Sequence, residues 1–160
     1  MMNEEILFKL AKPYLKKNYF GLAHTRRVFN IAKNNFEIPE EKKDLVYCSI
    51  ILHDVGGSSI KEQYEKGPKI AKTILEQLNY DRKFIQEVCG IISIHHDHPE
   101  HPSKAFQILY DSDRLVMLSP EEFPYYNAIP DFNWKKIIES IYSNYARKLA
   151  KILLENRKNT

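Results

Sequence analysis

The sequence is poor in residues that interrupt helices and in residues that form covalent cross-links. Only 5 glycines occur among 160 residues, and no alternation of period two extends far enough to predict a strand. The 2 cysteines, Cys48 and Cys89, lie in apolar helical patterns and lack Cys-x-x-Cys spacing. We interpret both as small core residues rather than metal ligands or a disulfide.

Long apolar runs are also missing. None approaches the roughly 20 residues that a helix needs to span a bilayer. The first residues, Met1-Met-Asn-Glu-Glu5, lack the basic and apolar segments of a signal peptide. We therefore expect a cytoplasmic protein without a membrane partner. A net charge of +3, from 24 basic and 21 acidic residues, does not favour nucleic acid as a partner.

Apolar residues recur mostly at spacings of three and four, which is typical of helices packed around a core. We predict an all-α fold, a compact single-domain bundle of six to eight helices that covers residues 1–160. The C-terminal helix is predicted at about 133–157, with Asp131 or Asn133 as its cap. One helix is predicted to open at Gly67-Pro68. Two segments are predicted to be irregular, residues 58–66 and 120–130.

The most informative feature is the dipeptide His53-Asp54. It ends an apolar run, residues 45–52, and two glycines follow soon after, so both side chains lie at the end of a buried helix. Polar groups in such a place need a partner, which a divalent metal ion would supply. His24 and Asp113 lie on the inward stripes of two other predicted helices and are further candidate ligands.

Two histidines and two aspartates from three helices form a mixed nitrogen and oxygen site. This donor set suits Mn, Fe, Co, Ni or Zn better than Ca, and Mg remains possible. Four protein ligands leave positions open for water and for a phosphate oxygen, which is chemistry for hydrolysing phosphate esters. The dipeptide alone is weak evidence for a metal site, because a second His-Asp pair, His96-Asp97, occurs in a polar loop.

Three segments resemble a known family. They are His24-Thr-Arg-Arg27, Leu52-His-Asp-Val-Gly56 and Tyr110-Asp-Ser-Asp-Arg-Leu115. Over about residues 20–120 the chain is similar to the HD-domain superfamily of metal-dependent phosphohydrolases, whose pattern is H…HD…D. The resemblance implies an all-α fold with a metal bound by four residues: His24, His53, Asp54 and Asp113.

The resemblance also implies a reaction. We expect hydrolysis of a phosphomonoester or phosphoanhydride, with a nucleotide as the substrate class, through a metal-bound hydroxide. Asp54 is expected to orient or deprotonate the water, and His95 or His96 to stabilise charge or protonate the leaving group. Arg27 and Lys69 are candidate phosphate-binding residues. Ordinary structural or surface positions would also explain these candidates, namely His95, His96, Arg27 and Lys69.

Two departures from the family pattern narrow the prediction. Relatives with two metals carry a further histidine after the dyad, whereas this chain has none between positions 53 and 95, and Gln63 or Tyr64 falls near that place. We therefore predict a single metal ion. Some mononuclear nucleotidases have a catalytic glutamate where Gly57 stands, so the sequence does not assign the proton donor.

Two other interpretations stay open. One is a non-catalytic module that keeps the metal and senses a nucleotide, and the other is a structural helical protein without a metal. The pair Tyr125-Tyr126 fits either stacking on a nucleobase or covering an edge of the core.

Overall fold

The computed structural model describes residues 2–15 and 20–159, which are helical and contain no strand. The all-α prediction is confirmed, and the described residues contain nine α-helices, one more than the predicted range allows. The α-helices and two 3₁₀-helices (η) are, in chain order, α1 (Glu4–Leu15), α2 (Gly21–Asn35), η1 (Glu40–Lys42), α3 (Lys43–Leu52), α4 (Ile60–Gln77), α5 (Arg82–Ile92), α6 (Lys104–Leu115), η2 (Val116–Leu118), α7 (Phe123–Asn127), α8 (Trp134–Ser140) and α9 (Asn144–Lys158).

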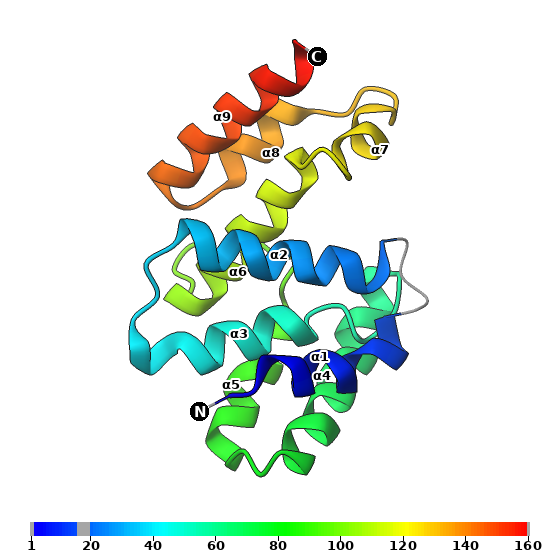
Figure 1. Ribbon diagram of the computed structural model, residues 1–160, viewed down its shortest axis with the longest axis vertical. Helices are drawn as coiled ribbons and strands as arrows, with labels where there is room; N and C mark the ends of the chain where they lie inside the picture. The colour runs from blue at the N-terminus through cyan, green and yellow to red at the C-terminus, as the bar shows by residue number, and fades with distance from the viewer. Residues whose placement is uncertain (1, 16–19, 160) are drawn as a thin grey trace.

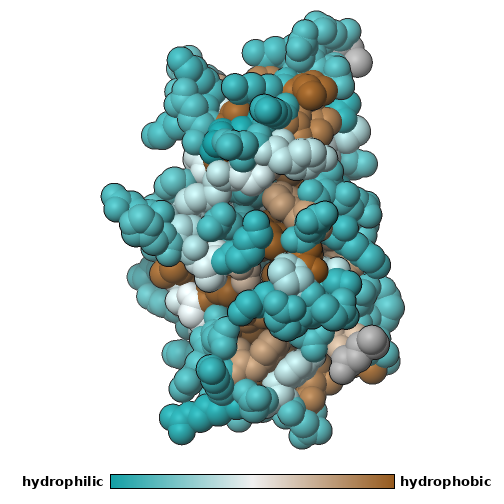
Figure 2. Space-filling view, turned by 90° about the vertical axis from the view of Figure 1, so that its left-hand side faces the viewer, coloured by the Kyte–Doolittle hydropathy of each residue, from teal (hydrophilic) through white to brown (hydrophobic). Residues whose placement is uncertain are grey.

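The helices are arranged around two hydrophobic clusters. Helices α2 and α6 cross the middle of the molecule, α1, α3, α4 and α5 lie on one side of them, and α7, α8 and α9 lie on the other (Figure 1). The larger cluster draws its buried residues from α1 to α6, and the smaller one draws them mainly from η2 and α7 to α9. Hydrophilic side chains cover most of the face in Figure 2, with hydrophobic ones between them along its middle. Within residues 2–15 and 20–159, no helix combines the length and the apolar character needed to cross a bilayer.

Helix α3 is the central helix of the larger cluster. Every residue from Leu45 to Leu52 is buried, which is typical of a helix enclosed by others. It contacts α1, α2, α5 and α6. The dyad His53-Asp54 follows its last residue directly, so the chain enters a turn at the place where the sequence analysis put the candidate ligands.

Side-chain caps define where several helices begin. In each case the capping oxygen accepts a hydrogen bond from the backbone N–H three residues later, which contributes about 1 kcal/mol to stability. The capping residues are Ser59, Asp81, Ser103, Asn133 and Ser143.

The prediction of an irregular segment at 58–66 was wrong. Helix α4 begins at Ile60 and continues through Gly67-Pro68, which does not open a helix. Ser59 accepts from the backbone N–H of Glu62, and its hydroxyl lies 3.2 Å from the Glu62 carboxylate, a reciprocal cap that starts the helix early. The irregular segment predicted at 120–130 likewise contains a short helix, α7.

The single C-terminal helix predicted at 133–157 is two helices, α8 and α9. The chain breaks because Asp111, fully buried in α6, accepts hydrogen bonds from the backbone N–H groups of Tyr142 (2.8 Å) and Ser143 (3.0 Å). Ser143 then caps α9. Asp111 therefore fixes the junction of the last two helices against α6.

Gly56 allows α4 to lie directly against the turn after the dyad. A Cβ atom at this position would be 2.7 Å from Gln63 Cα and 2.7 Å from Gly67 N, closer than side-chain carbons come to a backbone. The side-chain amide of Gln63 donates to the carbonyl of Gly57 at 3.0 Å. This close approach of the two backbones carries Gln63 to the site described below.

We expect Gly56→Ala to lower the free energy of unfolding by about 1–3 kcal/mol, because the added methyl group forces two backbones apart. Gly90→Ala is the matched control, since nothing lies within 4 Å of a Cβ built there in α5. Alanine at that helical position should leave stability unchanged or raise it. Urea unfolding measures both variants, and equal stability of the two would contradict the close approach at Gly56.

Candidate metal centre

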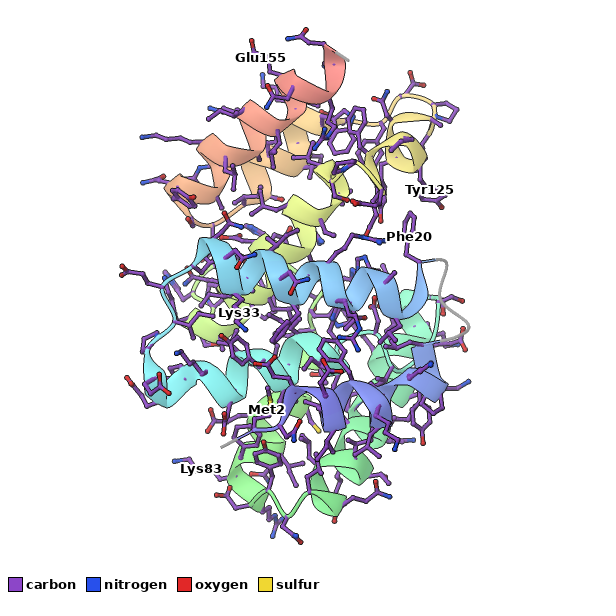
Figure 3. The ribbon with its side chains drawn as sticks, in the orientation of Figure 1. Met2, Phe20, Lys33, Lys83, Tyr125 and Glu155 are labelled. Atoms are coloured by element: carbon purple, nitrogen blue, oxygen red, sulfur yellow. The ribbon has the colours of Figure 1, made fainter. Side chains whose placement is uncertain are left out.

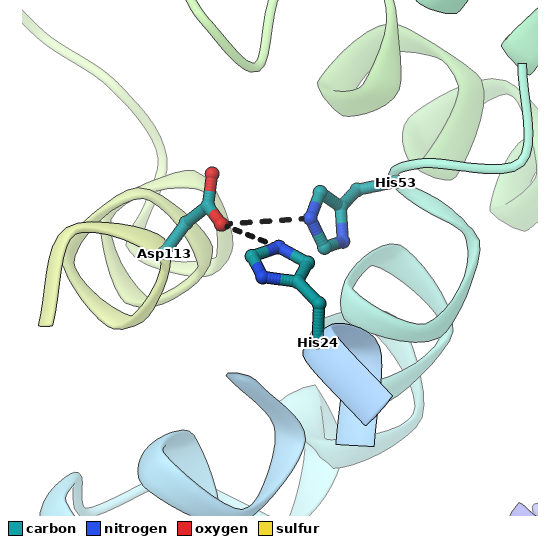
Figure 4. A group of neighbouring side chains, drawn as sticks. All are labelled: His24, His53 and Asp113. Atoms are coloured by element: carbon teal, nitrogen blue, oxygen red, sulfur yellow. Dashed lines mark ion pairs between the residues drawn. The ribbon is translucent and has the colours of Figure 1, made fainter. Parts of the chain in front are cut away.

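Three helices bring the four predicted ligands to one point. His24 Nε2 lies 3.1 Å from Asp113 Oδ1 and 3.4 Å from Asp54 Oδ2. His53 Nε2 lies 3.4 Å from Asp54 Oδ2 and 3.7 Å from Asp113 Oδ1. Figure 4 shows how His24 from α2, His53 from the end of α3 and Asp113 from α6 converge. The structure therefore joins side chains that are up to 89 positions apart, from 24 to 113.

Each imidazole at the centre is held through its Nδ1 atom. His53 and His95 follow the last turns of α3 and α5, and their Nδ1 atoms lie 2.5 and 2.7 Å from the backbone carbonyl oxygens three residues earlier. His24 Nδ1 lies 3.1 and 3.0 Å from the two carboxylate oxygens of Glu122. Acceptors at Nδ1 leave the Nε2 atoms of these rings directed at the centre, the orientation that metal-binding histidines require.

One buried nitrogen of the site has no hydrogen-bond partner in the described part of the chain. It is Nε2 of His53, a residue with 0% exposure. An orphaned nitrogen beside two carboxylates is costly in a protein interior. A divalent cation accepts a nitrogen lone pair and compensates the carboxylates at once, so the residues present fit a metal ion.

Protons balance the charges of the metal-free site. Burial lowers the pKa of His24, but hydrogen bonds to Asp113 and Glu122 and the charges of Asp113 and Asp54 outweigh it and raise this pKa to about 11. Burial raises the pKa of Asp54, but the nearby histidines, His53 first, lower it to about 2. Burial opposes ionisation of Asp113 too, yet its hydrogen bond to His24 and the charges of His53 and His24 hold its pKa well below the ordinary value. Burial lowers the pKa of His53, but the charges of Asp54 and Asp113 outweigh it and raise this pKa, so at neutral pH a metal ion would replace protons on both His24 and His53.

Asp54 lies between two groups of possible ligands. Potential ligand atoms of His24, His53 and Asp113 lie within 4.8 Å of one another, and so do those of Asp54, His95 and His96. Asp54 Oδ2 faces the first group, and its Oδ1 lies 3.7 Å from His95 Nε2. His95 is thus an immediate neighbour of the predicted metal ligands.

Gln63 occupies the place where two-metal relatives were expected to have a histidine. Its Oε1 lies 3.1 Å from His95 Nε2 and 2.6 Å from His96 Nε2. The hydrogen bond from its amide nitrogen to Gly57 fixes the orientation of the amide. The sequence analysis named Gln63 only as a neighbour of that place, whereas the structure makes it a partner of both imidazoles.

Gly57, which stands where some relatives carry a catalytic glutamate, has a φ of 141°. A glutamate rarely adopts this backbone conformation, whereas a glycine adopts it freely. The turn therefore disfavours a glutamate at position 57.

A cavity of about 390 Å³ opens onto the centre, a size suited to a small molecule. Figure 3 shows Phe20, from the start of α2, close to Tyr125 of α7, and their ring centroids are 5.5 Å apart. The lining combines site residues with aromatic and apolar ones and a single arginine: Phe20, Gly21, His24, Asp54, Ser58, Gln63, His96, Asp113, Arg114, Met117, Tyr126 and Ile137.

The two predicted phosphate-binding residues are not among the described residues that line this cavity. Arg27 Nε donates to Glu122 Oε2 at 2.9 Å, which directs its guanidinium to that carboxylate. Lys69 lies on an exposed face of α4. Arg114, to which the sequence analysis gave no role, lines the cavity, 3.3 Å from Asp113 and with its guanidinium 4.2 Å from the ring centre of Tyr110.

Comparison with known families agrees with this geometry. The structure is an all-α bundle in which two histidines and two aspartates, a donor set that could hold a metal ion, meet at one buried point. A family model described as HD domain matches residues 21–118, a stretch that contains all four of these side chains. The match covers more than half of the chain, which therefore belongs to the HD-domain superfamily of metal-dependent phosphohydrolases. Among curated proteins and solved structures, no match to the chain was found.

We expect binding of Mn²⁺ to the metal-free protein at pH 7 to release about one to two protons per ion, because the metal replaces the proton of His24 and that of His53, whose pKa is also raised. Below the raised pKa values of these two imidazoles, apparent affinity should increase, for each unit rise in pH, about tenfold per proton released. Isothermal titration calorimetry in buffers of different ionisation enthalpy measures the proton count. Binding that neither releases protons nor depends on pH would contradict this account of the metal-free site.

Proposed function

We propose that this protein is a metal-dependent phosphohydrolase that holds one divalent ion through His24, His53, Asp54 and Asp113. The observation that carries the proposal is the orphaned Nε2 atom of His53, buried where two carboxylates and a second imidazole converge. The donor set suits Mn, Fe, Co, Ni or Zn, with Mg possible. A divalent ion supplies Lewis-acid chemistry, since it activates water and polarises a phosphoryl group.

The side chains around the ion have separate roles in this proposal. Asp54 Oδ1 faces His95, whereas its Oδ2 faces the first ligand group, and we assign to Oδ1 the acceptance of a proton from the attacking water. His95 Nε2, 3.7 Å from that oxygen, donates a proton to the leaving group. Burial and the neighbouring His95 lower the pKa of His96 to about 4, so its imidazole is neutral at pH 7. We therefore assign the proton-donor role to His95 rather than to His96.

A single ion is favoured by the contacts of Gln63. Its Oε1 holds the Nε2 atoms of His95 and His96, the atoms that a second ion would need. A second ion on Asp54, His95 and His96 would have to displace this amide from both rings. Elemental analysis of the purified protein tests the count, and we propose a stoichiometry of one.

The lining of the cavity supports a small phosphorylated substrate with an apolar or aromatic part. Among its described residues, Arg114 is the only lysine or arginine, which suits a substrate that carries few phosphate charges. Phe20 and Tyr126 supply aromatic surface beside the histidines. We propose a nucleotide as the substrate class, with Arg114 at the phosphate and these rings beside the base.

Hydrolysis is tested by phosphate release from nucleotides and sugar phosphates with Mn, Co, Ni, Fe or Mg added. We expect turnover with at least one combination, and a loss of at least about 100-fold in Asp54→Asn, because even an outer-sphere partner of a metal ligand is worth 10–100-fold. Asp131→Asn is the matched control, on an exposed residue that does not line the cavity. A protein that binds metal and nucleotide without turnover would instead be the sensing module.

We expect Arg114→Gln to lower kcat/KM by about 10–100-fold, mainly through a higher KM, because a hydrogen bond from a charged donor to phosphate is lost. Lys69→Gln removes a similar charge outside the cavity and should leave kcat/KM unchanged. Steady-state kinetics with the best substrate compares the two variants. A larger decrease in kcat/KM for Lys69→Gln than for Arg114→Gln would contradict this assignment and favour Lys69 as the phosphate-binding residue.

A further inference from the structure

A buried carboxylate lies behind the ring of His24. Glu122 has 0% exposure, and its two oxygens lie 3.1 and 3.0 Å from His24 Nδ1. Oε2 also accepts a hydrogen bond of 2.9 Å from Arg27 Nε. A carboxylate removed from water is stable only when its charge is paired and its lone pairs are used. The contacts with His24 and Arg27 therefore compensate the buried charge of Glu122.

His24 needs this partner because of its place in a helix. His53 and His95 stand at helix ends, where the carbonyl three residues earlier accepts both the backbone N–H and the Nδ1 hydrogen of the same histidine. His24 lies within α2, where the carbonyls accept from amides four residues further on. The Nδ1 atom of His24 instead faces the carboxylate of Glu122, so its acceptor comes from another part of the chain.

The C-terminal part of the chain holds Glu122 in place. Its backbone N–H donates to Ser119 Oγ at 3.2 Å. The next residue, Phe123, is buried against Trp134 with ring centroids 5.2 Å apart, as part of the smaller hydrophobic cluster. Glu122 lies beyond residue 118, where the family match ends. The helices after that point thus reach the metal centre through this side chain.

We infer that Glu122 is a positioning residue for metal binding, which fixes the ring of His24 and is itself fixed by Arg27. The inference rests on the proposed function, since it takes His24 to be a metal ligand. A carboxylate suits the place because both oxygens accept hydrogen bonds and its charge strengthens the imidazole as a donor to a metal. A glutamine of the same size would lose the charge and put N–H donors where an oxygen now accepts.

The test compares Glu122→Gln with Glu121→Gln in the full chain, using Co²⁺ as the probe. Glu121 is the neighbouring residue and is exposed, so the same change of charge there should not alter metal binding. We expect Co²⁺ to bind Glu122→Gln about 10–100-fold more weakly than the wild type by calorimetry. The visible absorption of the bound Co²⁺ should also change, which a merely structural role of Glu122 would not cause.

The outcomes separate this inference from the proposed function. Equal Co²⁺ affinity and an unchanged spectrum in folded Glu122→Gln would overturn the positioning role, while Co²⁺ binding by the wild type would leave the metal site standing. A wild type that binds no Co²⁺ would overturn both. If Glu122→Gln does not fold, Glu122→Asp replaces it, since this variant keeps the charge for Arg27 but withdraws the oxygens from His24. Unchanged affinity in that variant would likewise overturn the inference.

Discussion

Two carboxylates, Asp54 and Asp113, are largely enclosed at the point where three helices meet, and the rest of the structure depends on how their charges are compensated. Their side chains are only 13% and 10% exposed, and the imidazoles of His24 and His53 are their nearest partners. Burying such a set without a compensating cation or proton costs several kcal/mol per charge. Helix packing therefore depends on the state of this site, because the helices can bury their apolar faces only when the charges of Asp54 and Asp113 are compensated.

The ends of two helices fix the orientation of imidazoles at the candidate metal centre. A histidine just after a helix can donate Nδ1–H to a carbonyl of the last turn, which directs its Nε2 away from the helix and fixes Nδ1 as the protonated nitrogen. His53 and His95 use this device at the ends of α3 and α5. The glycine turn after His53 brings α4 against the same place and adds Gln63 to the second ring. Backbone groups thus do much of the positioning, with little need for extra polar side chains.

What the sequence predicted depended on whether a residue's position was set by local periodicity. The metal-ligand candidates His24 and Asp113 lie on apolar stripes, so their inward direction could be predicted. The start of α4 could not, because its buried stripe begins with Gln63 and Gly67, which a count of apolar residues does not register. The break between α8 and α9 could not be predicted for another reason. Hydrogen bonds to Asp111, over 30 residues away in the chain, create it.

Two parts of the chain form the site, and one supplies the candidate ligands while the other completes the cavity wall. The segment that matches the family supplies all four candidate ligands, whereas Tyr126 and Ile137, from α7 and α8, add to the cavity wall. Those helices pack in the smaller hydrophobic cluster. The 3₁₀-helix η2 connects this cluster to α6, and Arg157 of α9 donates a hydrogen bond to the carbonyl of Leu118 in η2. A change in this cluster would therefore alter the shape of the cavity while His53 and Asp54, held by α3, keep their places. The C-terminal helices can thus reshape the cavity without moving His53 and Asp54, whereas His24 depends on them, because its Nδ1 contacts Glu122.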